Sequence, residues 1–354
     1  MPYIDLIQQR VRLEDVVATG TIVRLESTGE DWDVERALLT LGAQQFDDEA
    51  AEYEYLTAEQ VDLISFDRGR IWPQRQWYLG YLALLAQIKQ QLAHCPPHRL
   101  MNHPDDIAIM FDKRRTHAAL SQQHISVPRA LPIVNSYSEL LTVMKETGIR
   151  RVFVKLAHGS SASGVLAYQM GGANNDKHKA TTTVEMVHTK GQAQLYNSLR
   201  VRAYHAQRDI AGIIDALCRH RVHVEEWVPK AGIAGRTFDL RVLVIGGSAK
   251  HTVVRMSRGP MTNLHLANVR GDAEAVRARM GEHHWQAAQR TCERAAACFK
   301  NSLYIGIDLL IGTDFRQHAV LEANAFGDLL PRLLYEGKDT YEEEIGSLMH
   351  GAPA

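Results

Sequence analysis

The stretch YIGIDLLIGTDFRQHAVLEAN (304–324) limits the fold more than any other part of the chain. Two apolar runs flank a short polar loop, which predicts two antiparallel strands joined as a hairpin. If Gly312 pairs with His318, Asp308 lies directly opposite Glu322. Side chains at opposite positions share one face of a sheet, with Cβ atoms about 5 Å apart. The hairpin therefore predicts two carboxylates side by side.

Two facing carboxylates repel each other unless a cation lies between them. Asn324 shares the face of Glu322, because side chains on a strand alternate with a period of two. Two acidic oxygen ligands and one amide favour Mg²⁺ or Mn²⁺ over zinc. The pattern indicates a metal site formed by Asp308, Glu322 and Asn324. The alternative is a pair of carboxylates on the solvent face of the sheet.

The composition is that of an ordinary globular protein, with 45% hydrophobic and 23% charged residues among 354. Forty basic and forty-one acidic residues give no overall field that would attract nucleic acid or an anionic membrane. No apolar run reaches membrane-spanning length, and the N-terminus lacks the apolar core of a signal peptide. The four cysteines show no CxxC or disulfide-framework spacing, and the seventeen histidines show no ligand pattern. We therefore expect a cytoplasmic protein of two or three packed subdomains.

Helix and strand patterns alternate along the first part of the chain, which suggests an α/β layer. There we expect strands at 21–26, 61–67 and 98–103, and helices at 33–42 (ending at Gly42) and 77–92. Later helices are expected at 112–124, 136–148, 209–220 and 273–300. Later strands are expected at 151–157, 164–170, 222–228, 238–245 and 250–257, with a hairpin within 171–200.

A lysine in a strand precedes a loop of small residues in VKLAHGSSASGV (154–165). Lys155 must reach an anion or extend to water, because its flanks are apolar. Backbone N–H groups and hydroxyls of the loop, at Gly159, Ser160 and Ser161, could contact phosphate oxygens. The loop is not a nucleotide P-loop, since the lysine precedes it and no GK[ST] follows. A hairpin turn with a surface lysine is the alternative.

Charged residues also interrupt two later strands. FDLRVLVI places Asp239 and Arg241 on one face, and Arg255 lies among valines in HTVVRMS. Arginines with apolar flanks are often buried against carboxylates or phosphates. A structural salt bridge of Asp239 with one of the arginines is the alternative. Asn263, in the polar segment that follows, is a further candidate donor.

Three arginines follow the expected strand at 61–67, in the loop DRGRIWPQRQWY. Loops at the carboxyl ends of strands are where α/β layers tend to bind ligands. Arg68, Arg70 and Arg75 therefore suggest a carboxylate substrate, although a subdomain interface explains them nearly as well.

In their order along the chain, these segments resemble the ATP-grasp superfamily over residues 105–335. MFDKRRTHAALSQQHISVPRALPI resembles the segment that opens the fold, and VFVKLAHGSSASGV resembles its second lysine and mobile phosphate loop. VEEWVPK resembles the strand that joins two lobes, and FDLRVLVI, VVRMS and NLH resemble the region that holds an acyl phosphate. GIDLLIG with LEAN resembles the metal-binding strand pair. The resemblance implies an ATP-grasp fold, in which two α+β subdomains clasp ATP, preceded by a small α/β domain. The expected domains are 1–104, 105–228 and 229–354.

The resemblance also implies a role for each matching residue. ATP would be bound by Lys113, Lys155, Gly159, Ser160 and Ser161 at its phosphates, and by Glu225, Glu226, Trp227 and Val228 at its adenine. Mg²⁺ or Mn²⁺ would be bound by Asp308, Glu322 and Asn324, while Arg241, Arg255 and Asn263 would be catalytic.

The activity implied is an ATP-dependent carboxylate–amine ligase that forms an amide through an acyl phosphate, releasing ADP and phosphate. The run Asn263-Leu264-His265 and the segment EEW resemble most closely the branch of ribosomal-protein glutamate ligase, and RGRIWP and NLHLAN resemble segments of a further bacterial ATP-grasp group. Two departures are an insertion over 171–220 and Ala162, where the family commonly has glycine. A small-molecule kinase on the same fold and an ATP-binding regulatory protein remain alternatives. The sequence leaves the carboxylate, the amine and the oligomeric state open, and a homodimer would be the commonest assembly.

Overall fold

The computed structural model describes residues 1–45, 47, 53–159, 162–172, 176–189 and 192–349. The predicted phosphate-loop residues Ser160 and Ser161 lie outside them. The chain folds into two compact units, and each is built from three separate stretches. Unit 1 comprises Met1–Val11, Thr28–Gln87 and Arg129–Trp227, and unit 2 comprises Arg12–Ser27, Ile88–Pro128 and Val228–Ala354. The division into domains at 104 and 228 stays a prediction.

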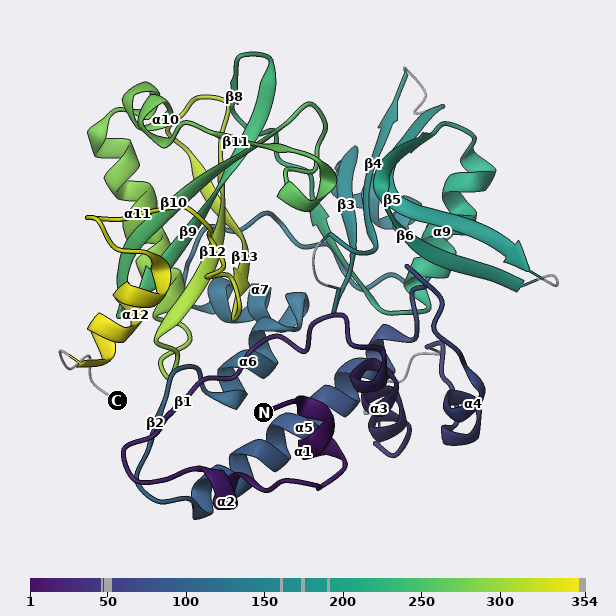
Figure 1. Ribbon diagram of the computed structural model, residues 1–354. Helices are drawn as coiled ribbons and strands as arrows, with labels where there is room; N and C mark the ends of the chain where they lie inside the picture. The colour runs from purple at the N-terminus through teal and green to yellow at the C-terminus, as the bar shows by residue number, and fades with distance from the viewer. Residues whose placement is uncertain (46, 48–52, 160–161, 173–175, 190–191, 350–354) are drawn as a thin grey trace. The chain divides into compact units, whose positions relative to one another are not determined.

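Unit 1 contains a five-stranded antiparallel sheet in the order β6-β5-β4-β3-β7 among the described residues (Figure 1). Its strands are β3 (Arg151–Leu156), β4 (Val165–Gly171), β5 (Lys177–Thr189), β6 (Gln192–Tyr204) and β7 (Val222–Glu226). Helix α9 (Gln207–Cys218) packs on β3, β5 and β6, and α8 (Tyr137–Thr147) packs on α9. Apolar side chains of these elements form one buried cluster. The predicted hairpin within 171–200 is confirmed as β5 and β6.

The remaining helices of unit 1 are α1 (Tyr3–Ile7), α3 (Trp32–Ala43) and α4 (Ala58–Leu63), and α5 (Gln74–His94) begins there. The expected strand at 61–67 is wrong, because Thr57 caps α4 through a capping box with Gln60. Gly42 was expected to end its helix, yet it lies inside α3. It is needed there for close packing, since a Cβ on Gly42 would lie 1.9 Å from the carbonyl oxygen of Gln76.

We expect Gly42→Ala to destabilise the protein by about 3 kcal/mol, because one of two packed helices must shift to admit the methyl group. Urea unfolding followed by circular dichroism measures the change. Gly212→Ala, in α9 of the same unit, is the matched control, because its Cβ would meet only the flexible end of Met186. Equal stability of the two variants would contradict the close contact of α3 with α5.

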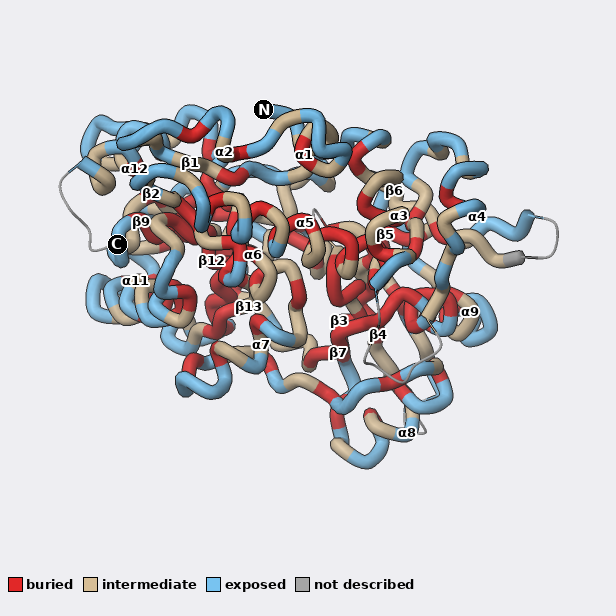
Figure 2. Tube along the Cα trace, turned by 90° about the horizontal axis from the view of Figure 1, so that it is seen from below, coloured by how far each residue is buried: buried red, intermediate tan, exposed pale blue. Residues whose placement is uncertain are grey.

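Unit 2 is built on a six-stranded antiparallel sheet in the order β11-β10-β9-β12-β13, with β8 also paired to β9 (Figure 1). Its strands are β8 (Gly232–Ile233), β9 (Arg236–Ile245), β10 (Ser248–Ser257), β11 (Val269–Gly271), β12 (Tyr304–Ile311) and β13 (His318–Asn324). Helix α11 (Glu282–Ala296) packs across β9, β10, β12 and β13. Strand β12 is buried along its whole length, as the red trace in Figure 2 shows.

Shorter elements complete unit 2. They are α2 (Leu13–Val16), the parallel pair β1 (Ile22–Val23) and β2 (Arg99–Leu100), α6 (Pro104–Met110), α7 (Lys113–Gln122), the 3₁₀ turn Leu264–Leu266, α10 (Ala273–Met280) and α12 (Thr340–Met349). The single helix expected over 273–300 is wrong, because Gly281 has φ 78° and separates α10 from α11. The expected strand at 21–26 shortens to β1. Both sheets and their helices confirm the mixed α+β class.

The hairpin of β12 and β13 has the predicted register at the candidate metal residues. Asp308 pairs with Glu322, and Gly306 pairs with Asn324. A bulge follows Asp308, so Ile311 rather than Gly312 pairs with His318. In the part of the chain that is described, no helix is long and apolar enough to cross a membrane.

Candidate functional site

Two buried aspartates occupy neighbouring strands of the unit 2 sheet. Asp239 on β9 is 1% exposed and Asp308 on β12 is 4% exposed. Asp308 pairs with Arg241, and Asp239 pairs with Leu310 two positions further along. Since alternate residues of a strand share a face, both carboxylates and the Arg241 side chain project from one side of the sheet. Buried carboxylates are costly unless cations or hydrogen bonds compensate them.

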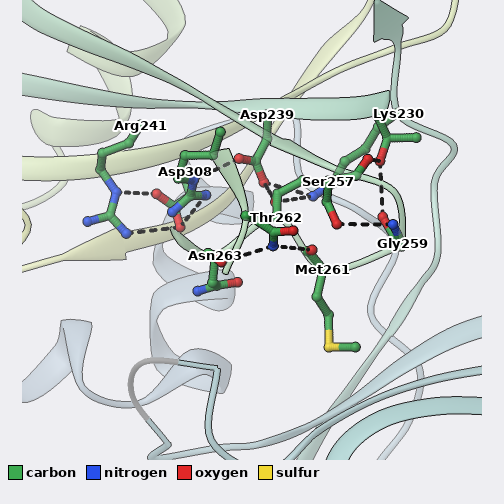
Figure 3. A network of polar contacts seen from close by, with 12 residues as sticks. Lys230, Asp239, Arg241, Ser257, Gly259, Met261, Thr262, Asn263 and Asp308 are labelled. Atoms are coloured by element: carbon green, nitrogen blue, oxygen red, sulfur yellow. Dashed lines mark hydrogen bonds and ion pairs between the residues drawn. The ribbon is translucent and has the colours of Figure 1, made fainter. Parts of the chain in front are cut away.

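Among the described residues, three cations contact these two carboxylates, and Figure 3 shows two of them, Lys230 and Arg241. Arg255 bridges the two carboxylates, with its Nε 2.8 Å from Asp239 Oδ1 and its Nη2 3.0 Å from Asp308 Oδ2. Lys230 Nζ lies 2.7 Å from Asp239 Oδ2. Arg241 donates to Asp308 through both Nε and Nη2. The cluster therefore carries one positive charge more than its carboxylates balance.

Opposite charges in this cluster stabilise one another's ionised states. Burial alone would raise the pKa of Asp239, but the charges of Arg255 and Lys230 hold it well below its ordinary value. Burial opposes ionisation of Asp308 in the same way, and Arg241 and Arg255 lower its pKa. Asp239 and Asp308 in turn raise the pKa of Arg255 against the effect of burial. Asp239, Asp308 and Arg255 are therefore charged at neutral pH.

The segment after β10 is tied to the cluster through Thr262. Its hydroxyl donates to Asp239 Oδ2 and accepts from Lys230 Nζ at 2.9 Å. The side-chain amide of Asn268 donates to the carbonyls of Met261 and Asn263, each at 2.9 Å. Figure 3 shows the predicted catalytic residue Asn263 next to this anchored position. The structure thus ties the segment that contains Asn263 to Asp239 and Lys230.

The predicted metal residues are engaged within unit 2 by groups of the chain itself. Lys113 is the first residue of α7, whose N-cap Asp112 accepts from the backbone N–H of Arg114 at 2.9 Å. The side-chain Nζ of Lys113 lies 2.8 Å from Glu322 Oε1. The side-chain Nδ2 of Asn324 donates to the carbonyl of Gly306 at 3.1 Å. Asn324 therefore presents its amide oxygen, which is the end that can bind a cation.

A lysine–glutamate pair is the matching feature of unit 1. Lys155 on β3 pairs in register with His223 on β7, and Phe153 pairs with Glu225. Lys155 Nζ contacts Glu225 Oε1, and His223 Nε2 lies 3.3 Å from Glu225 Oε2. Burial opposes the charge of Glu225, yet Lys155 and His223 lower its pKa to about 2. The predicted phosphate lysine is held in place by a carboxylate of its own sheet.

The other predicted nucleotide residues of unit 1 lie at the ends of its strands. The N–H groups of Glu226 and Trp227 donate to the carbonyls of Arg129 and Arg151, at 2.8 and 3.0 Å. Any adenine contact from these two residues would therefore come from other atoms than their amide nitrogens. The N–H of Gly159 donates to the carbonyl of Leu156 at 3.3 Å. Ala162 has φ 63°, a conformation that favours glycine.

The three arginines of the 67–78 loop have different surroundings in unit 1. Arg75 is buried and binds Asp47 through two hydrogen bonds of 2.9 and 2.7 Å. Arg70 lies near the rings of Trp72 and Tyr196, at 5.4 and 5.5 Å from their centres. Arg68 is exposed. The salt bridge to Asp47 gives Arg75 a structural role. The substrate-binding prediction therefore rests on Arg68 and Arg70.

Two polar members of the cluster, Lys230 and Thr262, were not predicted from the sequence. Lys230 follows a proline after β7 and looks like a surface residue in the sequence. Thr262 precedes the candidate Asn263 and has no pattern of its own. The available signal was Asp239, because a buried carboxylate on an apolar strand needs more than one partner.

No family model matches the chain, and no curated protein matches it. Several solved structures are similar to it. One is the ATP-grasp ligase PsnB complexed with a phosphomimetic variant of its minimal precursor, Mg and ADP. It is 19% identical, the match covers 73% of this chain and 61% of that chain, and the TM-score is 0.37. Another is N5-carboxyaminoimidazole synthase from Aspergillus clavatus in complex with ADP and 5-aminoimidazole ribonucleotide. It is 13% identical, with 75% and 57% of the two chains covered and a TM-score of 0.47.

A third similar structure is the macrocyclase MdnC bound with precursor peptide MdnA from Microcystis aeruginosa MRC. It is 11% identical, with 93% of this chain and 99% of that chain covered and a TM-score of 0.46. The chain spans about six tenths of the length of the first two structures. At these identities and TM-scores the similarities assign no activity to the chain.

Proposed function

We propose that the chain is an ATP-dependent carboxylate–amine ligase of the ATP-grasp superfamily. In the proposed reaction a substrate carboxylate oxygen attacks the γ-phosphorus of ATP, and the bond from that phosphorus to the β,γ-bridging oxygen breaks, releasing ADP. An amine nitrogen then attacks the acyl-phosphate carbon, and phosphate leaves as the amide forms. The chemistry requires cations at the transferred phosphoryl group and exclusion of water.

The observation that carries this proposal is the buried cluster of three cations and two carboxylates in unit 2. Its uncompensated positive charge suits a dianionic phosphoryl group, and its arginines are fixed by Asp239 and Asp308 before a ligand binds. Fixed donors need no reorganisation when charge develops, so they stabilise a transition state more than mobile ones. Arg241 and Arg255 are thus proposed to bind the transferred phosphoryl group. Asn263, in the segment that Thr262 anchors to the cluster, is proposed to donate to the oxyanion of the tetrahedral intermediate.

The oxygen atoms next to this cluster fit a hard divalent cation. Asp308 and Glu322 are directly opposite on β12 and β13, and Asn324 presents an amide oxygen on the same face. Among the described residues no group of three or more His, Cys, Asp or Glu side chains could hold a metal by itself. Mg²⁺ suits a site with so few protein ligands, because it binds one or two carboxylates and completes its coordination shell with water and substrate phosphates. When bound, it would neutralise phosphate charge.

Two lysines are proposed to neutralise further phosphate oxygens, Lys113 in unit 2 and Lys155 in unit 1. Each is already paired with a carboxylate, Glu322 or Glu225, and so is oriented before nucleotide binds. Gly159, Ser160 and Ser161 are proposed to assist Lys155, and Glu225, Glu226, Trp227 and Val228 to bind the adenine. We propose an amino acid or peptide for at least one substrate, bound with help from Arg68 and Arg70. The chain is also proposed to belong to the branch of ribosomal-protein glutamate ligase. A cytoplasmic location and a homodimer are proposed as well.

Nucleotide titration by calorimetry tests the binding part of this proposal. The wild type should bind the non-hydrolysable analogue AMPPNP more tightly with Mg²⁺ than with EDTA. Glu322→Gln should lose that difference, because the amide oxygen is neutral. Binding that is equally tight in EDTA would reject a metal at Asp308 and Glu322.

Lys113 and a metal ion would compete for Glu322. We therefore expect Lys113→Met to bind Mn²⁺ alone about tenfold more tightly than the wild type, because the competing charge is gone. Electron paramagnetic resonance of free Mn²⁺ gives the dissociation constant. Lys113→Arg keeps the charge and should behave like the wild type. Weaker Mn²⁺ binding in Lys113→Met than in Lys113→Arg would show that Glu322 is no metal ligand.

A further inference from the structure

The turn that follows the candidate metal strand packs against the candidate catalytic arginine. Residues Ala325 to Asp328, in AFGD, leave β13 directly after Asn324. A Cβ added at Gly327 would lie 2.7 Å from the Cα of Gly306 on β12 and 3.1 Å from Nη1 of Arg241. The backbone of the turn therefore lies directly beside the guanidinium of Arg241. Position 327 has room only for glycine, because a Cβ there would come too close to Gly306 and Arg241.

Buried polar groups hold both ends of this turn. At its start, Asn102 is 1% exposed, and its Nδ2 donates to the carbonyl of Ala325 at 2.9 Å and to that of Tyr304 at 3.0 Å. At its end, Asp328 is 3% exposed and accepts a hydrogen bond from Nη2 of Arg24. Arg24 comes from the segment after β1, almost the full chain length away in sequence. The fold thus uses two distant residues to fix four residues beside the cluster.

Several further contacts hold the side chain of Arg24 in place. Its Nη1 donates to Glu344 of α12, its Nε donates to Glu26, and its guanidinium carbon lies 4.7 Å from the ring centre of Tyr304. Glu344 is fully buried, and burial followed by the charge of Asp328 raises its pKa to about 8. Arg24 acts in the opposite direction and lowers this pKa. Asp328 is the other buried carboxylate that Arg24 holds.

We propose that Arg24 and Asp328 are positioning residues for Arg241, because their ion pair fixes the Ala325–Asp328 turn against which the Arg241 guanidinium rests. Arg241 has two supports in this arrangement. Asp308 orients its Nε and Nη2, and the turn limits the side of the guanidinium that carries Nη1. The proposal rests on the function proposed above only for the role of Arg241 at the transferred phosphoryl group.

The first test needs no ligand. In a ¹⁵N spectrum of arginine side chains, the Nε–H signal of Arg241 is assigned by its loss in Arg241→Lys. Asp328→Asn should shift or broaden that signal, since the amide keeps the shape of Asp328 but not its charge. Glu344→Gln is the matched control, because it alters the other buried partner of Arg24 and leaves the turn untouched; it should leave the signal in place. An unmoved signal in Asp328→Asn would overturn the proposal.

The second test uses nucleotides. If Arg241 contacts the γ-phosphate, Asp328→Asn should lower the preference for Mg·AMPPNP over Mg·ADP about tenfold, as the weakening of one charged hydrogen bond would. Mg·ADP binding should be unchanged, which a merely destabilised protein would not show. In Arg241→Ala the added Asp328→Asn change should have no further effect on this preference. Equal weakening of both nucleotides, or additive losses in the double variant, would contradict positioning through Arg241.

A second variant covers a failure of Asp328→Asn to fold. Arg24→Lys keeps the charge but cannot hold Asp328, Glu344 and Glu26 at once, so it should shift the same Arg241 signal and lower the same preference. A normal spectrum and a normal preference would overturn the proposal. If the wild type binds neither nucleotide, the proposed function fails, while the ligand-free spectra still decide whether the turn positions Arg241.

Discussion

Asp308→Asn is expected to reduce MgATP-dependent phosphate release about 1,000-fold, the largest loss that we expect from a single substitution in the site. The amide keeps the shape of the side chain but removes the charge that holds Arg241 and Arg255 and would bind the metal. Release of inorganic phosphate, followed with a coupled assay in the presence of substrate, measures the loss.

The control for this variant lies in the same hairpin. Asp314 is in the loop between β12 and β13, where it accepts from the N–H groups of Arg316 and Gln317 at 3.0 Å. Asp314→Asn changes one carboxylate at the far end of the hairpin from Asn324, so the rate should stay within about twofold of the wild type. A rate within tenfold of the wild type in Asp308→Asn would remove Asp308 from the site.

Asp239→Ala is expected to destabilise unit 2 by about 3–5 kcal/mol, because it leaves Arg255 and Lys230 as buried charges without their shared carboxylate. Equilibrium unfolding in urea measures the change. Asp272→Ala is a suitable comparison, since this exposed residue only caps α10 and its loss should cost about 1 kcal/mol. If the Asp239→Ala variant were no less stable than the Asp272→Ala variant, the cluster would not support the fold.

The same carboxylate predicts a pH dependence with a definite sign. The folded-state pKa of Asp239 lies below the ordinary value of 3.8, so the unfolded chain takes up this proton first as the pH falls. The stability that Asp239 contributes is complete above about pH 5 and is lost as the pH falls toward its folded pKa. The difference in unfolding free energy between wild type and Asp239→Asn should therefore be constant from pH 5 to 7 and shrink below about pH 4. A difference that grows on acidification would contradict the ion pairs.

The candidate site was predictable where chemistry and strand periodicity coincide. Asp308 and Glu322 face each other because apolar runs fix both strands, and the carboxylates sit at matching positions within them. The bulge after Asp308 moved the hairpin end by one residue without disturbing this pair. Asp239 and Arg255 likewise form the salt bridge that their apolar flanks suggested.

Other features depended on contacts that a local pattern does not contain. VDLISFD has the apolar content of a strand, but the capping box at Thr57 begins a helix instead. Gly42 looks like a helix end, yet it permits the close packing of α3 on α5. Lys230 contacts Asp239 and Thr262, 9 and 32 positions away, and Arg24 contacts Asp328, 304 positions away. Local composition indicates which side chains need partners, and the fold decides which ones they find.

The central claim is that the chain couples ATP cleavage to amide formation, and phosphorus NMR tests it most directly. Purified protein would be mixed with ATP, Mg²⁺ and a pool of amino acids and short peptides. We predict ADP and free phosphate in equal amounts, formed only when the pool is present and not formed by Asp308→Asn. ADP with a new phosphoester and no free phosphate would contradict the ligase and indicate a kinase, and unchanged ATP would contradict turnover with this substrate class.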